Sequence, residues 1–218
     1  MLLAARQEYS RAEWISDAVI HVTGVVAALI AVPVLITLAI VLRGDAPAVA
    51  STTLYGVALI AMLVFSALYN MSSRPGPRLR RIFRSLDHTA ILCLIAATYT
   101  PFVFLSGAKA TGLLAALWAA AVLGAAIRAL APDRLKLAAV ALALLMGWAG
   151  LISGGAVFAG LSTSVVVLIA VGGILYTLGV GFCLLDRLPF HYTIWHVFVL
   201  AASAVFYAAV TMQLVQSA

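Results

Sequence analysis

The sequence predicts an all-α membrane protein, a bundle of seven transmembrane helices with its N-terminus in the cytoplasm and its C-terminus outside. Of its 218 residues, 65% are hydrophobic and only 9% are charged, and the mean hydropathy is +1.17. A soluble domain carries roughly 25% charged residues. The polar surface is too small to cover a water-soluble globule, so the bilayer must be the solvent. Seven apolar segments and an uneven distribution of Lys and Arg supply the helix count and the orientation.

The predicted spans follow from length and hydropathy. A helix needs about 20 predominantly apolar residues to cross the hydrocarbon. We treat residues 1–218 as a single transmembrane domain with seven such segments. Its spans are about 17–42, 51–72, 87–106, 111–130, 136–156, 162–185 and 191–214.

Turn-forming and charged residues separate most of these segments. Proline, glycine or charge interrupts the apolar pattern at 44–47, 74–77, 106–109, 132–134 and 186–189. The stretch 160–164 contains no charge, so the boundary between the fifth and sixth spans stays open.

The positions of Lys and Arg predict the orientation. With the N-terminus inside, the outside loops hold only Arg43 and Lys109 of the 13 basic residues. Cytoplasmic loops carry the excess of Lys and Arg, so the chain is expected in the inner (plasma) membrane as a multi-pass protein. The same rule explains the net charge of +6, so membrane lipids rather than nucleic acid are the predicted partners. The inside set is Arg6, Arg11, Arg74, Arg78, Arg80, Arg81, Arg84, Arg128, Arg134, Lys136 and Arg187.

Unusual polar residues lie at one membrane level. Ionisable groups within a span are costly and mark functional sites. In the predicted orientation, these residues occupy the cytoplasmic ends of four different spans, although chance would scatter them between leaflets. They predict a site open to the cytoplasm, formed by Asp17, His21, Ser66, Asn70, Asp87, His88, His191 and His196.

Each of these residues also has a purely structural interpretation. Asp17 and His21 are spaced i,i+4 and could pair on one helix face. Asp87 could be a first-turn acid favoured by the helix dipole, and Ser66 could bond to a carbonyl of its own helix. His88 could lie at the interface, and His196 could be a hydrogen-bonded structural residue. These alternatives do not explain why the residues share one level.

Four motifs resemble those of the bacterial hemolysin III family. Residues 84–102, RSLDHTAILCLIAATYTPF, resemble its third-helix signature, and 194–200, IWHVFVL, its seventh-helix signature. Residues 21–24, HVTG, resemble its first-helix motif, and 66–70, SALYN, stand where the family has Ser-x-x-Tyr-His. The family is related to the progestin and adipoQ receptors, which implies a seven-helix bundle.

The resemblance also implies a zinc site on the cytoplasmic side. In the family, zinc is held by one histidine that closes the second-helix motif and two in an H-x-x-x-H motif on the seventh helix. An acid at the start of the third helix, here Asp87, and a second-helix serine, here Ser66, hold or activate the zinc-bound water. Such a site suits hydrolysis of a lipid amide, because zinc lowers the pKa of its water and polarises a carbonyl.

This chain departs from that ligand set. Asn70 stands at the second-helix histidine position, and Tyr192 at the first histidine of the seventh-helix motif. His196 matches the last histidine, but His191 is displaced by one residue, which turns it by roughly 100° on the helix. Asparagine is a poor zinc ligand beside imidazole. The sequence leaves two possibilities: a rebuilt metal site of His196 and His191 with Asp87 and His21, or a metal-free cluster of Asn70, Asp87 and His196.

Two functions follow from these possibilities. The first is a regulator or sensor of the lipid state of the membrane, with a lipid ligand and an altered zinc site. The alternative is a metal-dependent intramembrane lipid amide hydrolase that uses Ser66 and Asp87 in catalysis and His196 in a rebuilt ligand set. A transporter or proton channel is disfavoured, because no polar residues line the outer half of the predicted spans.

Overall fold

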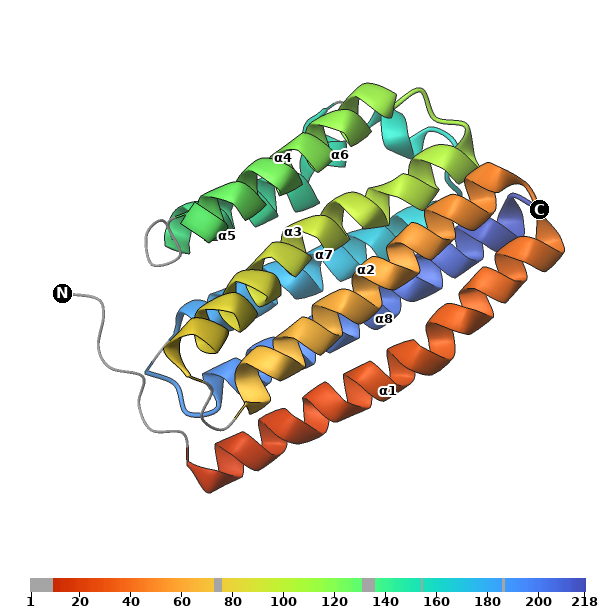
Figure 1. Ribbon diagram of the computed structural model, residues 1–218. Helices are drawn as coiled ribbons and strands as arrows, with labels where there is room; N and C mark the ends of the chain where they lie inside the picture. The colour runs from red at the N-terminus through yellow and green to blue at the C-terminus, as the bar shows by residue number, and fades with distance from the viewer. Residues whose placement is uncertain (1–9, 73–75, 131–135, 154, 186) are drawn as a thin grey trace.

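The computed structural model describes residues 10–72, 76–130, 136–153, 155–185 and 187–218, and within them it contains helices and no strand (Figure 1). Some predicted breaks lie outside these described residues, at 74, 75, 132–134 and 186. The same is true of three basic residues of the predicted inside set, Arg6, Arg74 and Arg134. The helices are α1 (Arg11–Leu42), α2 (Ala46–Met71), α3 (Pro77–Ser106), α4 (Thr111–Leu130), α5 (Lys136–Gly147), α6 (Ala149–Ile152), the 3-10 helix η1 (Ala156–Phe158), α7 (Thr163–Leu184) and α8 (His191–Gln216).

Side-chain caps set where several helices begin. Ser10 and Glu13 form a reciprocal capping box, in which Glu13 N–H donates to Ser10 Oγ at 3.2 Å and Ser10 N–H donates to Glu13 Oε2 at 2.9 Å. Helix α1 therefore begins at Arg11 rather than near residue 17, and α3, with a proline in its first turn, begins at Pro77 rather than near 87. The predicted spans start farther along these helices, because hydropathy marks the apolar part of a helix and more polar turns precede it.

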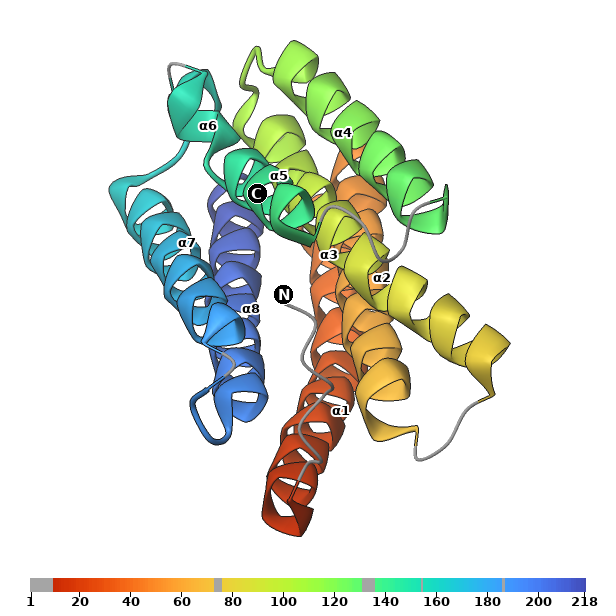
Figure 2. The same ribbon diagram turned by 90° about the vertical axis from the view of Figure 1, so that its left-hand side faces the viewer.

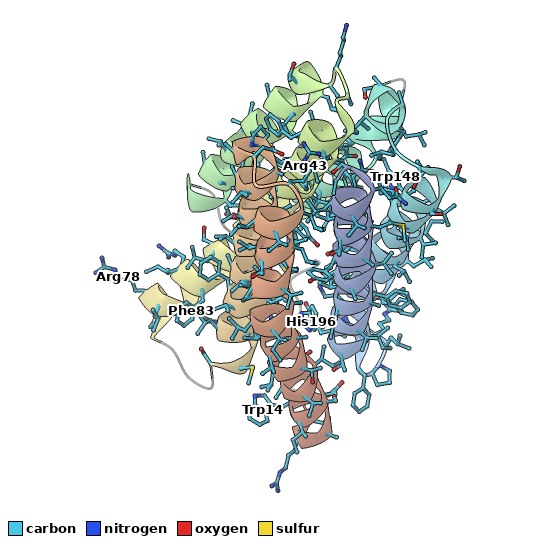
Figure 3. All side chains as sticks on the ribbon, turned by 90° about the vertical axis from the view of Figure 1, so that its right-hand side faces the viewer. Trp14, Arg43, Arg78, Phe83, Trp148 and His196 are labelled. Atoms are coloured by element: carbon cyan, nitrogen blue, oxygen red, sulfur yellow. The ribbon has the colours of Figure 1, made fainter. Side chains whose placement is uncertain are left out.

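Six helices are long and apolar enough to cross a membrane among the described residues. They are α1, α2, α3, residues Thr111–Arg128 of α4, α7 and α8. Large apolar side chains on their outer surfaces are exposed, as for Ile30, Val41 and Val122. Figure 3 shows side chains projecting all around the bundle. An exposed apolar perimeter is expected where lipid is the solvent.

The predicted fifth span, 136–156, is not one continuous helix. Helix α5 ends at Gly147, and the short helices α6 and η1 follow. Tyr99 of α3 binds the backbone at this break: its hydroxyl donates to Gly147 O at 2.7 Å and accepts from Gly150 N at 3.0 Å. Backbone groups freed inside a membrane need such partners. At 12 residues, α5 is shorter than the roughly 20 needed to span the hydrocarbon.

Helices α1 and α8 run parallel, although they are the first and last of the chain. At one end, Phe190 N–H donates to Glu13 Oε1 at 2.9 Å, and towards the other end Tyr207 Oη donates to Ala31 O at 2.7 Å. Because the later residue of α1 pairs with the later residue of α8, the two helices run in the same direction. Figure 2 shows α8 between α7 and α1, and α2 beside α3. Fully buried residues such as Leu35, Tyr55 and Val210 fill the core that α1, α2, α3, α7 and α8 share.

The turn between α1 and α2 is tied to the C-terminal end of α8. Arg43 donates from Nη1 to Ser217 O at 2.6 Å and from Nε to Asp45 Oδ2 at 2.8 Å. Asp45 also accepts from Ala48 N–H and so caps α2. These two donors lower the pKa of Asp45, so its cap is present at neutral pH and is lost only as the pH falls through that lowered value.

Replacing Arg43 by alanine is therefore expected to lower the Tm of the detergent-solubilised protein by about 2–4 °C, the shift that a loss near 1 kcal/mol produces at this size. The Arg43 side chain links the turn before α2 to the end of α8, so its removal breaks the hydrogen bonds to both Asp45 and Ser217. Lys109→Ala, at the other basic residue of the predicted outside loops, is the control. Equal Tm values for the two variants would contradict a stabilising role for Arg43.

Candidate functional site

Four helix segments bring the predicted polar residues to one end of the bundle. The first turns of α1 and α8 lie at this end, together with the last turns of α2 and the first half of α3 (Figure 1). Helix α1 carries Asp17 and His21, and α8 carries His196. Helix α2 carries Ser66 and Asn70, and α3 carries Asp87 and His88.

Asp17, His21 and His196 form the centre of the site. His196 Nδ1 donates to Asp17 Oδ1 at 2.6 Å, and His21 Nδ1 donates to the main-chain oxygen of Asp17 at 2.8 Å. The two imidazole rings meet edge to face with their centroids 4.4 Å apart. All three side chains are buried, and Figure 3 shows His196 between the ribbons of α1 and α8.

These bonds fix the tautomers of both histidines. Carboxylate and carbonyl oxygens accept hydrogen bonds, so Nδ1 carries the proton in His21 and in His196. In the neutral rings each Nε2 then offers a lone pair. A histidine that binds a metal is usually held in this way, with its other ring nitrogen donating to a carboxylate or a backbone carbonyl.

Ser66 and Asn70 extend the network onto α2. Ser66 Oγ lies 3.3 Å from His21 Nε2 and can donate to it. Asn70 Nδ2 donates to Ser66 O at 2.9 Å and approaches Ser66 Oγ at 3.4 Å. The Asn70 amide thus turns back onto its own helix. Asp87 on α3 interacts with the Ser66 hydroxyl and is close enough to His21, His88 and His196 for electrostatic attraction.

His88 and His191 take other positions. His88 Nδ1 donates to Arg84 O on its own helix at 2.6 Å, and its ring faces Tyr69. The His191 ring packs on Tyr192, with centroids 4.0 Å apart. Among the described residues, the group whose ligating atoms all lie within 4.8 Å of one another is Asp17, His21 and His196, without His191. The sequence interpretation placed Asp17 in the polar cluster rather than among the ligands; its i,i+4 spacing from His21 was the signal that could have shown this.

A large cavity opens beside the network. Its volume is about 1560 Å³, and Ser66, Asn70, Asp87, His88 and His196 line it at the polar end. Farther in, the walls are largely apolar and come from α3, α5, η1, α7 and α8, with Phe102, Val157, Phe158, Ile169 and Phe206 among them. Ligand cavities typically measure about 300–1,000 Å³, so this one has room for more than a small polar metabolite.

Comparison with known proteins identifies the family. A family model described as Haemolysin-III related matches residues 11–207. The chain belongs to this haemolysin III-related family. It is 35% identical over 210 residues to Hemolysin-3 of Bacillus cereus, covering 94% of each chain, and 35% identical over 202 residues to the Hemolysin-3 homolog of Bacillus subtilis (strain 168), covering 91% of this chain and 92% of the relative.

A mammalian relative also matches this haemolysin III protein. The human monocyte to macrophage differentiation factor is 31% identical over 170 residues, which cover 75% of this chain and 70% of the relative. The resemblance found in the four motifs is therefore confirmed, and so is membership among multi-pass membrane proteins with adipoQ receptor-like relatives.

The residues of this chain do not fit the three-histidine zinc set that the resemblance implies. Asn70 stands where the family motif has a histidine ligand, and its amide donates to Ser66 O instead. Tyr192 stands at the position of another of the three histidines. A different set is close enough to hold a metal: Asp17, His21 and His196 each offer one ligating atom, and these atoms lie within 4.8 Å of one another. The site thus has the donor chemistry for a metal, but from other positions.

Proposed function

We propose that this haemolysin III protein senses or regulates the lipid state of the membrane by binding an amphipathic lipid in its internal cavity. The observation that carries the proposal is the cavity of about 1560 Å³, which is polar at one end and largely apolar beyond it. A lipid has the same division into head and chain. Its chain would contact α3, α5, α7 and α8, and its head would lie near Ser66, Asn70 and Asp87.

The proposal includes seven membrane crossings and places the protein in the inner (plasma) membrane. The site then faces the cytoplasm. Parallel α1 and α8 support an odd number of crossings, because the chain must return to the same side before α8 begins. Six helices are long enough, so α5, α6 and η1 together would make the remaining crossing. The excess of Lys and Arg at the end that carries the site supports its cytoplasmic location.

Occupancy of the cavity can be coupled to the helix bundle through the polar network. The bond between Asp17 and His196 joins α1 to α8, and His196 also lines the cavity. A lipid head that contacts His196 changes its hydrogen bonding and therefore the energy of packing α8 on α1. This gives two packing states with different affinities for the lipid, which a sensor requires.

Filling the cavity with protein should abolish lipid binding. Ala170 on α7 lines the cavity, so Ala170→Trp should reduce binding of a fluorescent acyl-chain lipid to the purified protein at least tenfold. Val167→Trp on the same helix is the matched control, because Val167 is exposed on the outer surface. Equal binding by the two variants, or none by the unaltered protein, would reject a lipid-binding cavity.

A second candidate is a metal-dependent intramembrane lipid amide hydrolase. Its specific support is the close group of Asp17, His21 and His196, whose ligating atoms all lie within 4.8 Å of one another. A bound zinc would supply a Lewis acid and lower the pKa of a water molecule. Ser66 and Asp87, which interact beside His21, would orient the water and the substrate head.

Metal content separates the two candidates. The hydrolase predicts about one zinc per chain after zinc supplementation, lost in His21→Ala and in His196→Ala. His191→Ala should keep the metal, because His191 lies outside the group. Elemental analysis of the purified proteins measures this. Absence of stoichiometric metal from the unaltered protein would exclude the hydrolase and leave the lipid sensor.

A further inference from the structure

A second group of charged side chains lines the cavity, apart from the network of Asp17 and His196. Arg84 on α3 and Arg128 on α4 belong to it, together with Arg80 and Arg187. Arg128 is only 7% exposed. Its guanidinium therefore lies inside the bundle rather than at a solvated surface, which requires compensation by charge or hydrogen bonds.

Arg84 and Arg128 are near enough to repel each other electrostatically, and both also act on His88. Two helices thus bring like charges together at the wall of the same cavity. Each guanidinium has five N–H donors, so each can bind an anion in addition to the protein contacts that it makes. An anion placed between them would relieve the repulsion.

The charge balance of the cavity favours an anion. Among the described residues that line it, four arginines face two carboxylates, Glu13 and Asp87. Both acids already have partners: Glu13 binds the N–H groups of Ser10 and Phe190, and Asp87 interacts with Ser66 and His88.

The cavity walls next to the arginines are apolar. Ala139, Val140, Ala143 and Leu144 of α5 line it, as do Ile91 and Ile95 of α3. A small inorganic anion would leave this apolar volume unfilled. A ligand with an anionic head and a hydrocarbon chain would satisfy both parts.

We infer that Arg84 and Arg128 bind the phosphate of an anionic phospholipid whose acyl chain occupies the cavity. Arginine forms paired hydrogen bonds with phosphate oxygens, and a phosphate has enough oxygens to engage guanidinium groups from two helices. The inference rests on the proposed lipid binding in the cavity and adds the class of headgroup. It makes Arg84 and Arg128 the residues that distinguish anionic from zwitterionic lipids.

Binding of fluorescent phosphatidylglycerol and phosphatidylcholine to the full-length, detergent-solubilised protein tests this inference. We expect the unaltered protein to bind phosphatidylglycerol at least tenfold more tightly. The double variant Arg84→Gln/Arg128→Gln should lose this preference and bind both lipids equally. Arg78→Gln is the matched control and should keep it, because Arg78 is exposed and points away from the bundle (Figure 3).

Two further measurements keep the result interpretable. Arg84→Lys/Arg128→Lys retains the charge but not the paired geometry, so a folded protein with a reduced preference is expected. Inorganic phosphate should compete only weakly, because it lacks the chain; full competition at equal concentration would show a site for free phosphate and overturn the lipid assignment. An unchanged preference in the Gln double variant would overturn the role of these arginines. If Ala170→Trp still blocks binding in that case, the cavity proposal stands without them.

Discussion

Replacing His196 by alanine is expected to lower the free energy of unfolding by about 3–5 kcal/mol, the cost of leaving a buried charge without its partner. The variant would leave the Asp17 carboxylate buried without the donor that now lies 2.6 Å from Oδ1. His21 lies 3.8 Å from the other carboxylate oxygen, too far for a hydrogen bond, so it cannot replace that donor as it stands.

Asp17→Ala should cost less, about 1–3 kcal/mol, because it strands an imidazole N–H rather than a carboxylate. The double variant Asp17→Ala/His196→Ala should cost less than the sum of the two single variants, with a coupling of about 0.5–3 kcal/mol. Unfolding in mixed micelles that contain a metal chelator measures all three values. His191→Ala on the same helix is the control, since His191 lies outside the Asp17 group. Additive costs would show that the pair contributes no stability of its own.

Gly179→Ala is expected to destabilise the protein by about 2 kcal/mol through overpacking between α7 and α8. An added Cβ would lie 2.7 Å from Phe198 Cβ and 3.0 Å from a ring atom of Trp195. Phe198 Cβ is attached directly to the backbone, so rotation of the side chain cannot move it away. One of the two helices must shift.

Gly181→Ala provides the control for this prediction. A Cβ at Gly181 would have nothing within 4 Å outside its own helix, and alanine is favoured over glycine in a helix by up to about 1 kcal/mol. This variant should therefore unfold at the same Tm as the unaltered protein or a higher one. Equal destabilisation of both variants would mean that α7 and α8 are not packed through Gly179.

The packing roles of the glycines could not be assigned from sequence. Glycine-rich spans permit close helix approach in general, yet only some of these glycines are used for it. Gly172 and Gly179 face aromatic side chains of α8, whereas Gly147 and Gly181 face open space. The difference depends on which side of each helix meets a neighbour, and α7 is so uniformly apolar that hydropathy does not mark a side.

The broken helix in the predicted fifth span shows the same limit. Hydropathy indicated a continuous span over 136–156, although glycines stand at 147, 150 and 155. Tyr99, far away in the sequence on α3, supplies the donor and acceptor that stabilise the broken backbone. A partner of this kind is not visible in local sequence.

The sequence by itself determined the class of protein, its family and the gathering of unusual polar residues at one end, because hydropathy and the order of motifs are properties of the chain in one dimension. It also showed that Asn70 and Tyr192 stand where the family motif has histidines. Only the tertiary structure decided that His196 rather than His191 meets Asp17, and that His21 completes the group. The physical reason is that each residue turns a helix by about 100°, so contacts between the first and last helices depend on how both are rotated in the bundle.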